Sequence, residues 1–111
     1  MAVYVANILI NQGADFSQTY TLEDTNSNSA QNLTGYNVDA KISKHHASTT
    51  QTSFNASISN AAGGEIKLTL TDIQTAALAP GRQVYDILLT HPDGTKERVV
   101  EGMAIVRDGV T

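Results

Sequence analysis

Apolar and polar residues alternate with a period of two along most of this 111-residue chain, and no other feature constrains its fold as strongly. Successive side chains of a β-strand point to opposite faces of a sheet, so this alternation is typical of strands that bury one face. The clearest example runs from Tyr36 to Ser43, where every second residue is apolar and the residues between are polar. Shorter alternations predict further strands at Phe16–Leu22, Phe54–Ile58 and Ile66–Leu70.

The segment Val84–Thr90 is the most apolar strand in the sequence, with apolar residues on both of its faces. It is therefore predicted to be a central strand that is covered on both sides. We expect the Tyr85 hydroxyl to bond to the backbone, as the corner tyrosine of a β-sandwich does. The strand that returns from it, Thr95–Val106, contains Gly102, which is expected to mark a bulge or a bend.

Turn-forming residues separate these strands. Asn60–Gly64 and His91–Gly94 are predicted to be tight turns, because their glycines can adopt positive φ. Asp24–Ser29 contains several turn formers and no apolar residue, so it is expected to be a loop or a hairpin connection. His45–Ser53 is polar and shows no periodicity, which predicts a surface loop.

One stretch departs from the period of two and predicts a short helix. Thr71 and Gln74 have the spacing of a capping box, in which each side chain bonds to the backbone of the other residue. The predicted apolar face of this helix consists of residues at helical spacing, Ile73, Ala76, Ala77 and Leu78. Pro80 and Gly81 end the helix.

About seven or eight short strands, separated by turns every 8–12 residues, predict an all-β fold. We expect an immunoglobulin-like β-sandwich of two sheets, with one short helix between two strands, in a single domain spanning residues 1–111. The chain contains no cysteine. The fold therefore cannot depend on disulfides, and a thiolate zinc site is excluded.

Composition and motifs argue against several classes of function. The net charge is −4 and the seven basic residues are dispersed, which does not suit a nucleic acid partner. No segment has the features of a signal peptide or the length of a membrane span. The adjacent His45 and His46 are a poor chelating pair in an extended chain, and no serine lies in a nucleophile motif. We therefore expect no enzyme activity, no catalytic or metal-binding residue and no cofactor.

If the chain has no active site, it must act through its surfaces, and the N-terminal segment is the candidate. The segment is apolar on both faces near its end, and residues 1–12 are a possible docking strand. The predicted interface residues are Val3, Tyr4, Val5, Ile8, Leu9 and Ile10. The alternative is that the segment forms an ordinary first strand of the sandwich. Assembly of several copies into a homo-oligomer is a second prediction.

Four stretches, in this order, carry a resemblance to a known family: "GADFSQTYTLED" (Gly13–Asp24), "NLTGYNVDAKI" (Asn32–Ile42), "GGEIKLTLTDIQTAALAPGRQVYDILLTHPDGTKERVVEG" (Gly63–Gly102) and "AIVRDGVT" (Ala104–Thr111). They cover about two-thirds of the chain, and the third stretch is the most specific. The sequence resembles short tail-associated virion proteins of bacteriophages. More distantly, it is similar to the N-terminal sandwich domain of phage upper-baseplate proteins.

This resemblance implies a non-enzymatic structural protein of the virion, assembled in the cytoplasm of the host bacterium. It implies a docking and assembly module of the tail, baseplate or neck, bound to other virion proteins. The family supplies no catalytic or cofactor residue to transfer to this chain. Two alternatives stay open: a capsid decoration protein, and a receptor- or carbohydrate-binding module. The latter commonly exposes aromatic residues, and of those present only Tyr4 is expected to be free of the core.

Overall fold

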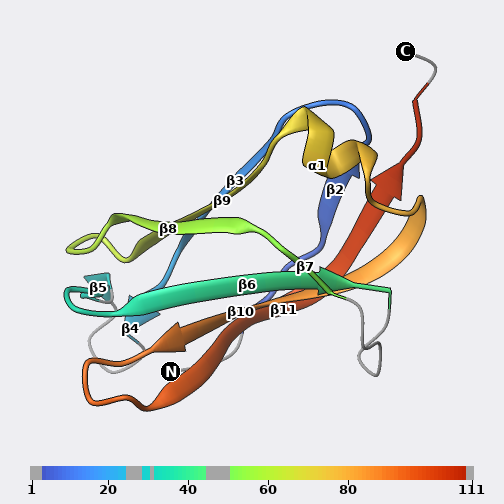
Figure 1. Ribbon diagram of the computed structural model, residues 1–111. Helices are drawn as coiled ribbons and strands as arrows, with labels where there is room; N and C mark the ends of the chain where they lie inside the picture. Colours follow the sequence, from blue (N-terminus) through green and yellow to red (C-terminus); the bar gives the residue numbers. More distant parts are fainter. Residues whose placement is uncertain (1–3, 25–28, 31, 45–50, 110–111) are drawn as a thin grey trace.

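Two β-sheets packed face to face make up most of the computed structural model, which describes residues 4–24, 29–30, 32–44 and 51–109 (Figure 1). Sheet A contains β1 (Tyr4–Val5), β2 (Ile8–Asn11), β6 (Asn37–Ser43), β7 (Gln51–Ser53), β10 (Gly81–Thr90) and β11 (Lys96–Arg107). Sheet B contains β3 (Phe16–Thr21), β8 (Asn55–Asn60) and β9 (Glu65–Leu70). A separate short pair is formed by β4 (Glu23–Asp24) and β5 (Ser29–Ala30), and the helix α1 (Asp72–Ala76) joins β9 to β10. The predicted all-β, immunoglobulin-like sandwich with one short helix is confirmed.

The strand order places the first and last strands of the chain side by side in sheet A. The order is β1–β11–β10–β6–β7, and β2 also pairs with β11. Both N-terminal strands run parallel to β11, whereas the other strand pairs of this sheet are antiparallel. Sheet B is antiparallel in the order β3–β9–β8. As predicted, the segment Val84–Thr90 belongs to a central strand, because β10 lies between β11 and β6.

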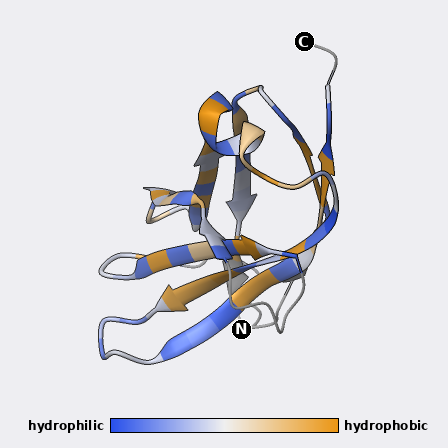
Figure 2. Ribbon diagram, turned by 45° about the vertical axis from the view of Figure 1, so that its right-hand side comes forward, coloured by the Kyte–Doolittle hydropathy of each residue, from blue (hydrophilic) through white to orange (hydrophobic). Residues whose placement is uncertain are grey.

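The core lies between the sheets and follows the alternation in the sequence. In β9, Ile66, Leu68 and Leu70 are buried, and in β6 the buried residues are Ala40 and Ile42. Figure 2 shows the same alternation as changes between blue and orange along the strands. Burying each large aliphatic side chain contributes about 1.5–3 kcal/mol, so these inward rows provide most of the driving force for folding.

The predicted turns are present at both glycine-containing sites. Gly94 has a φ of 93°, and its N–H donates to the carbonyl of His91 at 2.9 Å. Gly64 has a φ of 69° at the end of the turn between β8 and β9. A side chain at either position would be strained, which explains why glycine occupies both.

Part of the predicted surface loop is a strand. Residues 51–53 form β7, in which Thr52 pairs with Ile42 of β6. The prediction failed here because β7 is an edge strand that is held by backbone hydrogen bonds and has mostly exposed side chains. Such a strand needs no apolar periodicity. Residues 45–50 of the predicted loop and residues 25–28 of the Asp24–Ser29 connection lie outside the described part of the chain.

The irregularity in β11 lies at Val99 rather than at Gly102. Ile87 pairs with Val100 and Leu88 pairs with Arg98, so Val99 is an extra residue in the ladder. The bulge turns two consecutive residues inward, and both Val99 and Val100 are buried. Gly102 is required for a different reason, because the backbone of Ala6 passes close to it.

The capping box of α1 is confirmed, but of the predicted apolar face only Leu78 is buried, whereas Ile73, Ala76 and Ala77 are exposed. The N–H of Gln74 donates to Thr71 Oγ1 at 3.2 Å, and the N–H of Thr71 donates to Gln74 Oε1 at 2.9 Å. Ile73 is 78% exposed, whereas Thr75 is fully buried. The Thr75 hydroxyl donates to the carbonyl of Ala14 and accepts from the N–H of Gly13, so it ties α1 to the connection between β2 and β3.

The outer face of β10 is not covered as predicted. Val84 and Leu88 are half-buried, and no further described layer lies on that side of sheet A. The prediction assumed that a strand with two apolar faces lies between two layers. Here the second apolar face belongs to an open surface.

Candidate functional site

The predicted N-terminal interface residues lie at the edge of sheet A, and only some of their side chains reach the surface. Ile8 and Ile10 are buried in the core of this chain, while Leu9 between them is 48% exposed. Val5 is 76% exposed. The backbone of Tyr4 pairs with Val100, its side chain lies outside the described part, and so does the whole of Val3. The segment thus forms the first strands of the sandwich, and only Val5 and Leu9 present described side chains to a partner.

These two side chains belong to a larger apolar surface that the strand register assembles. Leu9 pairs with Ile105, which is 37% exposed, and Met103 pairs with Val84. Val5, Val84 and Met103, together with Glu101 and Gly102, line a shallow hollow of about 240 Å³. We call five of the apolar residues on the outer face of sheet A the outer patch: Val5, Leu9, Val84, Met103 and Ile105.

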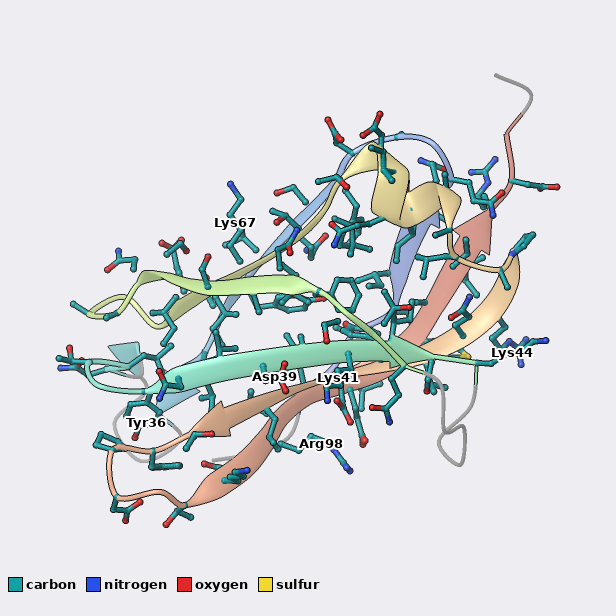
Figure 3. All side chains as sticks on the ribbon, in the orientation of Figure 1. Tyr36, Asp39, Lys41, Lys44, Lys67 and Arg98 are labelled. Atoms are coloured by element: carbon teal, nitrogen blue, oxygen red, sulfur yellow. The ribbon has the colours of Figure 1, made fainter. Side chains whose placement is uncertain are left out.

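The outer patch lies between two groups of charges along the strands. On one side, Arg98 Nε lies 3.3 Å from Asp86 Oδ2, and Arg98 Nη1 lies 3.8 Å from Glu101 Oε2. One guanidinium thus faces two carboxylates, and Lys41 on β6 pairs in register with Asp86, so this end carries charges of both signs. On the other side, Arg82 pairs in register with Ile105, and Arg107 follows two residues later on β11. Figure 3 shows Arg98, Asp39 and Lys41 on the outer side of sheet A and Lys67 on the opposite side of the sandwich.

A tight contact between backbones fixes the N-terminal strands against β11. The link between β1 and β2 turns the carbonyl of Ala6 over Gly102, where a Cβ atom would lie 2.1 Å from the Ala6 oxygen. The Tyr85 hydroxyl donates to this carbonyl at 2.5 Å, and the N–H of Met103 donates to Asn7 Oδ1 at 3.0 Å. The predicted backbone bond of Tyr85 is therefore confirmed, with a partner in the N-terminal link. This contact positions Val5 and Leu9 in the outer patch.

A second tyrosine extends this contact across the sandwich. The hydroxyl of Tyr20 on β3 donates to the hydroxyl of Tyr85 on β10 at 2.9 Å, which links the two sheets. Burial, followed by the bond to Tyr85, raises the pKa of Tyr20 well above its usual range. Burial also raises the pKa of Tyr85, against a smaller opposing effect of the bond from Tyr20. Both hydroxyls therefore stay neutral and act as structural donors.

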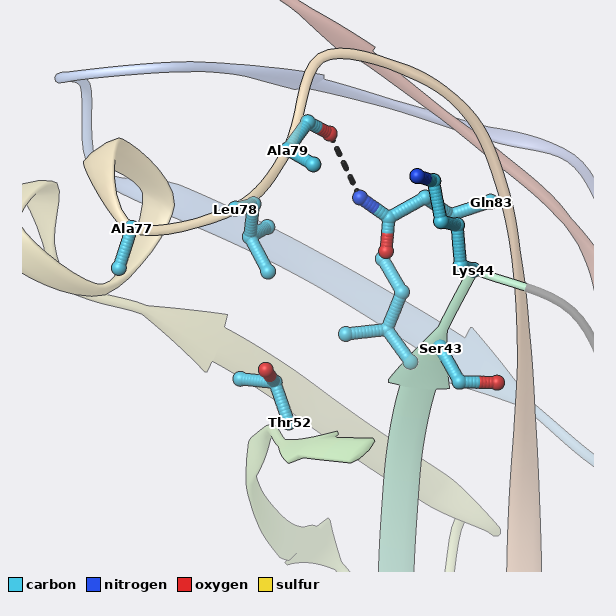
Figure 4. Close-up of a pocket in the computed structure, with 8 residues that line it drawn as sticks. Ser43, Lys44, Thr52, Ala77, Leu78, Ala79 and Gln83 are labelled. Carbon is cyan, nitrogen blue, oxygen red and sulfur yellow. Dashed lines mark hydrogen bonds between the residues drawn. The ribbon is translucent and has the colours of Figure 1, made fainter. Parts of the chain in front are cut away.

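A pocket among the described residues lies beside the C-terminal end of α1 (Figure 4). It measures about 360 Å³ and is lined mainly by aliphatic and hydroxyl side chains with Lys44 and Gln83. The Gln83 amide donates to the carbonyl of Ala79 at 2.6 Å, which ties β10 to the segment after the helix. Lys44 is the pocket's one ionisable lining residue, so the described lining offers no pair of groups for acid–base chemistry.

The described part of the chain holds no group of metal-binding residues and no long apolar helix. No three His, Asp or Glu residues of that part lie close enough together to hold a metal ion. No helix of that part has the length and hydropathy of a segment that crosses a membrane. His45 and His46, which the sequence analysis considered as ligands, lie outside it. His91 Nε2 lies 2.9 Å from Glu97 Oε2 at the hairpin between β10 and β11, where the pair closes the turn.

Sequence comparisons found neither a matching protein-family model nor a matching curated protein. Among solved structures, the chain is similar to the internalin-like protein lmo2027 of Listeria monocytogenes, with 16% identity and a TM-score of 0.44. That likeness covers 95% of this chain and only 28% of the other protein. The chain is also similar to a structure from photo-crosslinking analyses of multimeric cell-adhesive interactions of VGSC beta subunits. This second likeness has 12% identity and a TM-score of 0.47, and covers 96% of this chain and 93% of the other. Both scores are low, so neither likeness says what this chain binds.

Three members of the outer patch, Val84, Met103 and Ile105, were not among the interface residues predicted from the sequence. The available signal was that Met103 and Ile105 alternate with Ala104 and Val106, so β11 is apolar on both faces near its end. The same property of β10 was interpreted as burial on both sides. An apolar second face indicates either a covering layer or an exposed patch, and only the strand arrangement distinguishes them.

Proposed function

We propose that this protein is a non-enzymatic structural component of a bacteriophage particle, a docking and assembly module that acts through surface contacts with other virion proteins. The observation that carries the proposal is the outer patch. Contiguous apolar residues exposed on a small folded protein mark sites of protein association. Val5 and Leu9 at the edge of sheet A and Ile105 beside them are all exposed.

Two features support an architectural role over a chemical one. The polar groups with unusual environments, the hydroxyls of Tyr20 and Tyr85, are used to join the sheets. The family resemblance of the sequence, which is strongest between Gly63 and Gly102, is to tail-associated virion proteins. A place in the tail, baseplate or neck follows from that resemblance, and the outer patch supplies the contact surface such a role needs.

The experiment is to find the protein in particles and to identify what the outer patch touches there. A photo-reactive residue would replace Leu9 in the full chain, with the same residue at Ile73 on α1 as a matched control, since both side chains are exposed. We expect purified particles to contain the protein and to give cross-links from position 9 to virion proteins, with few from position 73. Particles that form normally and lack the protein would overturn the proposal.

A further inference from the structure

The edges of the two packed sheets differ in how they are protected. An edge strand presents backbone N–H and C=O groups that can pair with another chain, and folded proteins usually prevent this with short strands, bulges, charges or prolines. At the edges of sheet A, β7 has three residues, and β1 and β2 are short strands separated by a link. At one edge of sheet B, the register of β8 shifts between Ile58 and Asn60. At the other edge, β3 has six residues, a continuous register with β9, and neither a charged residue nor a proline.

The hydrogen bonds of β3 indicate which of its backbone groups point to the free edge. Leu22 follows β3 in the same register, and its N–H donates to the carbonyl of Gly64 at 2.9 Å. In an antiparallel pair, residues that bond to the partner strand alternate with residues whose N–H and C=O point away from it. Counting back from Leu22, the backbone groups of Ser17, Thr19 and Thr21 therefore point away from β9. All three residues are exposed.

We propose that β3 pairs with β3 of a second copy of the chain, in antiparallel orientation, so that sheet B continues from one copy into the other. A twofold axis perpendicular to the sheet places Thr19 of one copy opposite Thr19 of the other, and Ser17 of each copy opposite Thr21 of the other. In this register every N–H and C=O of these three residues finds a partner. A register centred on Gln18 or Tyr20 would instead place Thr21 or Ser17 opposite a residue outside β3.

The side chains of β3 select a second copy as the occupant. On the outer face, the hydroxyl side chains of Ser17, Thr19 and Thr21 lie opposite one another, which is a favourable cross-strand combination. On the inner face, Gln18 lies opposite Tyr20. The strand has no charged residue, so it offers no specific contact to a strongly acidic or basic segment. A second copy provides a strand of equal length whose backbone groups and hydroxyls are in matching order.

The inner side of this edge is open to a further strand. Gln18 pairs with the buried Leu68 and belongs to the inward row of β3, yet it is exposed. A hollow of about 300 Å³ lies between the end of β3 and residues of sheet A that include Val5 and Val100. The Gln18 amide donates to the carbonyl of Thr19 at 3.4 Å, a weak bond that pairing would replace with a shorter one from the second copy.

The chain has no cysteine, so disulfide cross-linking of the purified full chain tests the register directly. In the proposed dimer the Cα atoms of the two Thr19 residues lie about 5.5 Å apart, a distance that a disulfide spans. Lys67→Cys is the matched control, because Lys67 is exposed and pairs with Thr19 one strand further from the axis. Its two copies would lie about 14 Å apart, too far for a disulfide. Under mild oxidation we expect Thr19→Cys to form a linked dimer about tenfold faster or more than Lys67→Cys.

Sedimentation velocity over a wide range of concentrations tests the backbone pairing. Thr19→Pro removes an N–H at the free edge and keeps the ladder with β9, so it should raise the dimer Kd about tenfold or more. Thr19→Val keeps the N–H and should change the Kd only a few fold. Leu9→Asp alters the outer patch and should leave the Kd unchanged. Circular dichroism of each variant confirms that the sandwich is folded.

Three results would overturn the proposal. The first is a chain that stays monomeric at every concentration, which would leave the edge of β3 to a strand of a different protein. The second is a dimer that Leu9→Asp weakens and Thr19→Pro does not. The third is a Lys67→Cys variant that cross-links as fast as Thr19→Cys. The purified chain suffices for all of these measurements, so their result is independent of the particle experiment above.

Discussion

The outer face of sheet A carries an apolar patch between two groups of charged residues, whereas the outer face of sheet B carries mainly hydroxyl and amide side chains. Along β3 the outward residues are Ser17, Thr19 and Thr21, and across the sheet they pair with Thr69, Lys67 and Glu65. The inner faces of the two sheets are alike, with buried aliphatic residues on both. The comparison teaches that the inward half of the alternation accounts for the shared core, and that the outward half distinguishes a polar outer face from one with an exposed apolar patch.

The comparison first requires that the two inner faces be equivalent. Ile87 of sheet A and Leu68 of sheet B are both fully buried. We expect Ile87→Ala and Leu68→Ala each to lower the free energy of unfolding by about 2–5 kcal/mol, because each leaves a cavity in the shared core. Urea unfolding followed by circular dichroism measures this. If the variant in one sheet lost almost no free energy of unfolding, that sheet would not be part of the same core, and the two inner faces would not be equivalent.

The next largest effect concerns the contact that holds the N-terminal strands on sheet A. Gly102→Ala would place a methyl group against the Ala6 carbonyl, so the link must shift and its bond from Tyr85 must lengthen. We expect a loss of about 1–3 kcal/mol in urea unfolding, typical of overpacking. Gly63→Ala is the control, because its Cβ would meet only the movable side chain of Asn60. Equal losses at both positions would contradict the role of Gly102.

The tyrosine pair that joins the sheets should show a graded effect. Tyr85→Phe removes the donor to Ala6 and the acceptor for Tyr20, and we expect it to cost about 1–3 kcal/mol. Tyr20→Phe removes one bond and leaves the contact with Ala6, so about 1 kcal/mol is expected. Denaturant unfolding of both variants at neutral pH measures the difference. A larger loss of stability in Tyr20→Phe than in Tyr85→Phe would show that Tyr20, and not the N-terminal link, is the important partner of Tyr85.

The same pair predicts a pH dependence with a definite sign. The pKa of each hydroxyl is raised in the folded state above the ordinary value of 10.0, so ionisation favours the unfolded chain. Their contribution to stability is complete below about pH 10 and is lost as the pH rises through the raised folded pKa values. The free energy of unfolding, measured with urea, should therefore fall above about pH 10. In the Tyr20→Phe variant it should fall less steeply. An equally steep loss in that variant would assign alkaline unfolding to other groups.

The smallest expected effect distinguishes the two outer faces directly. Arg98→Ala removes two exposed ion pairs from sheet A, and Lys67→Ala removes an exposed charge from sheet B, for which the described residues offer no ion-pair partner. Exposed pairs contribute little, so we expect a loss below about 1 kcal/mol for Arg98 and a smaller one for Lys67. Denaturant unfolding at low and high salt measures the loss of stability in both variants. Only the loss caused by Arg98→Ala should become smaller at high salt. A larger loss at Lys67 would contradict the view of sheet B as a plain solvated face.

Several elements could be predicted from the sequence because their causes are local. The inward rows of β6 and β9 follow from alternation, and the start of α1 follows from two side chains three residues apart. The outer patch could be predicted only in part. Val5 and Leu9 were among the predicted interface residues, but Ile8 and Ile10 in the same segment lie in the core. A short apolar run does not reveal which of its faces points inward until its partner strand is known.

The sequence by itself therefore determined the sandwich class, the turns with positive-φ glycines and the capped helical turn, since each depends on neighbouring residues. The tertiary structure alone decided that β1 and β2 run parallel to β11, that Val99 forms a bulge and that Thr75 is buried in place of Ile73. It also decided where the outer patch lies. The physical reason is that these features depend on contacts between separate segments of the chain, such as those of Leu9 with Ile105 and of Thr75 with Ala14, and no local propensity specifies those contacts.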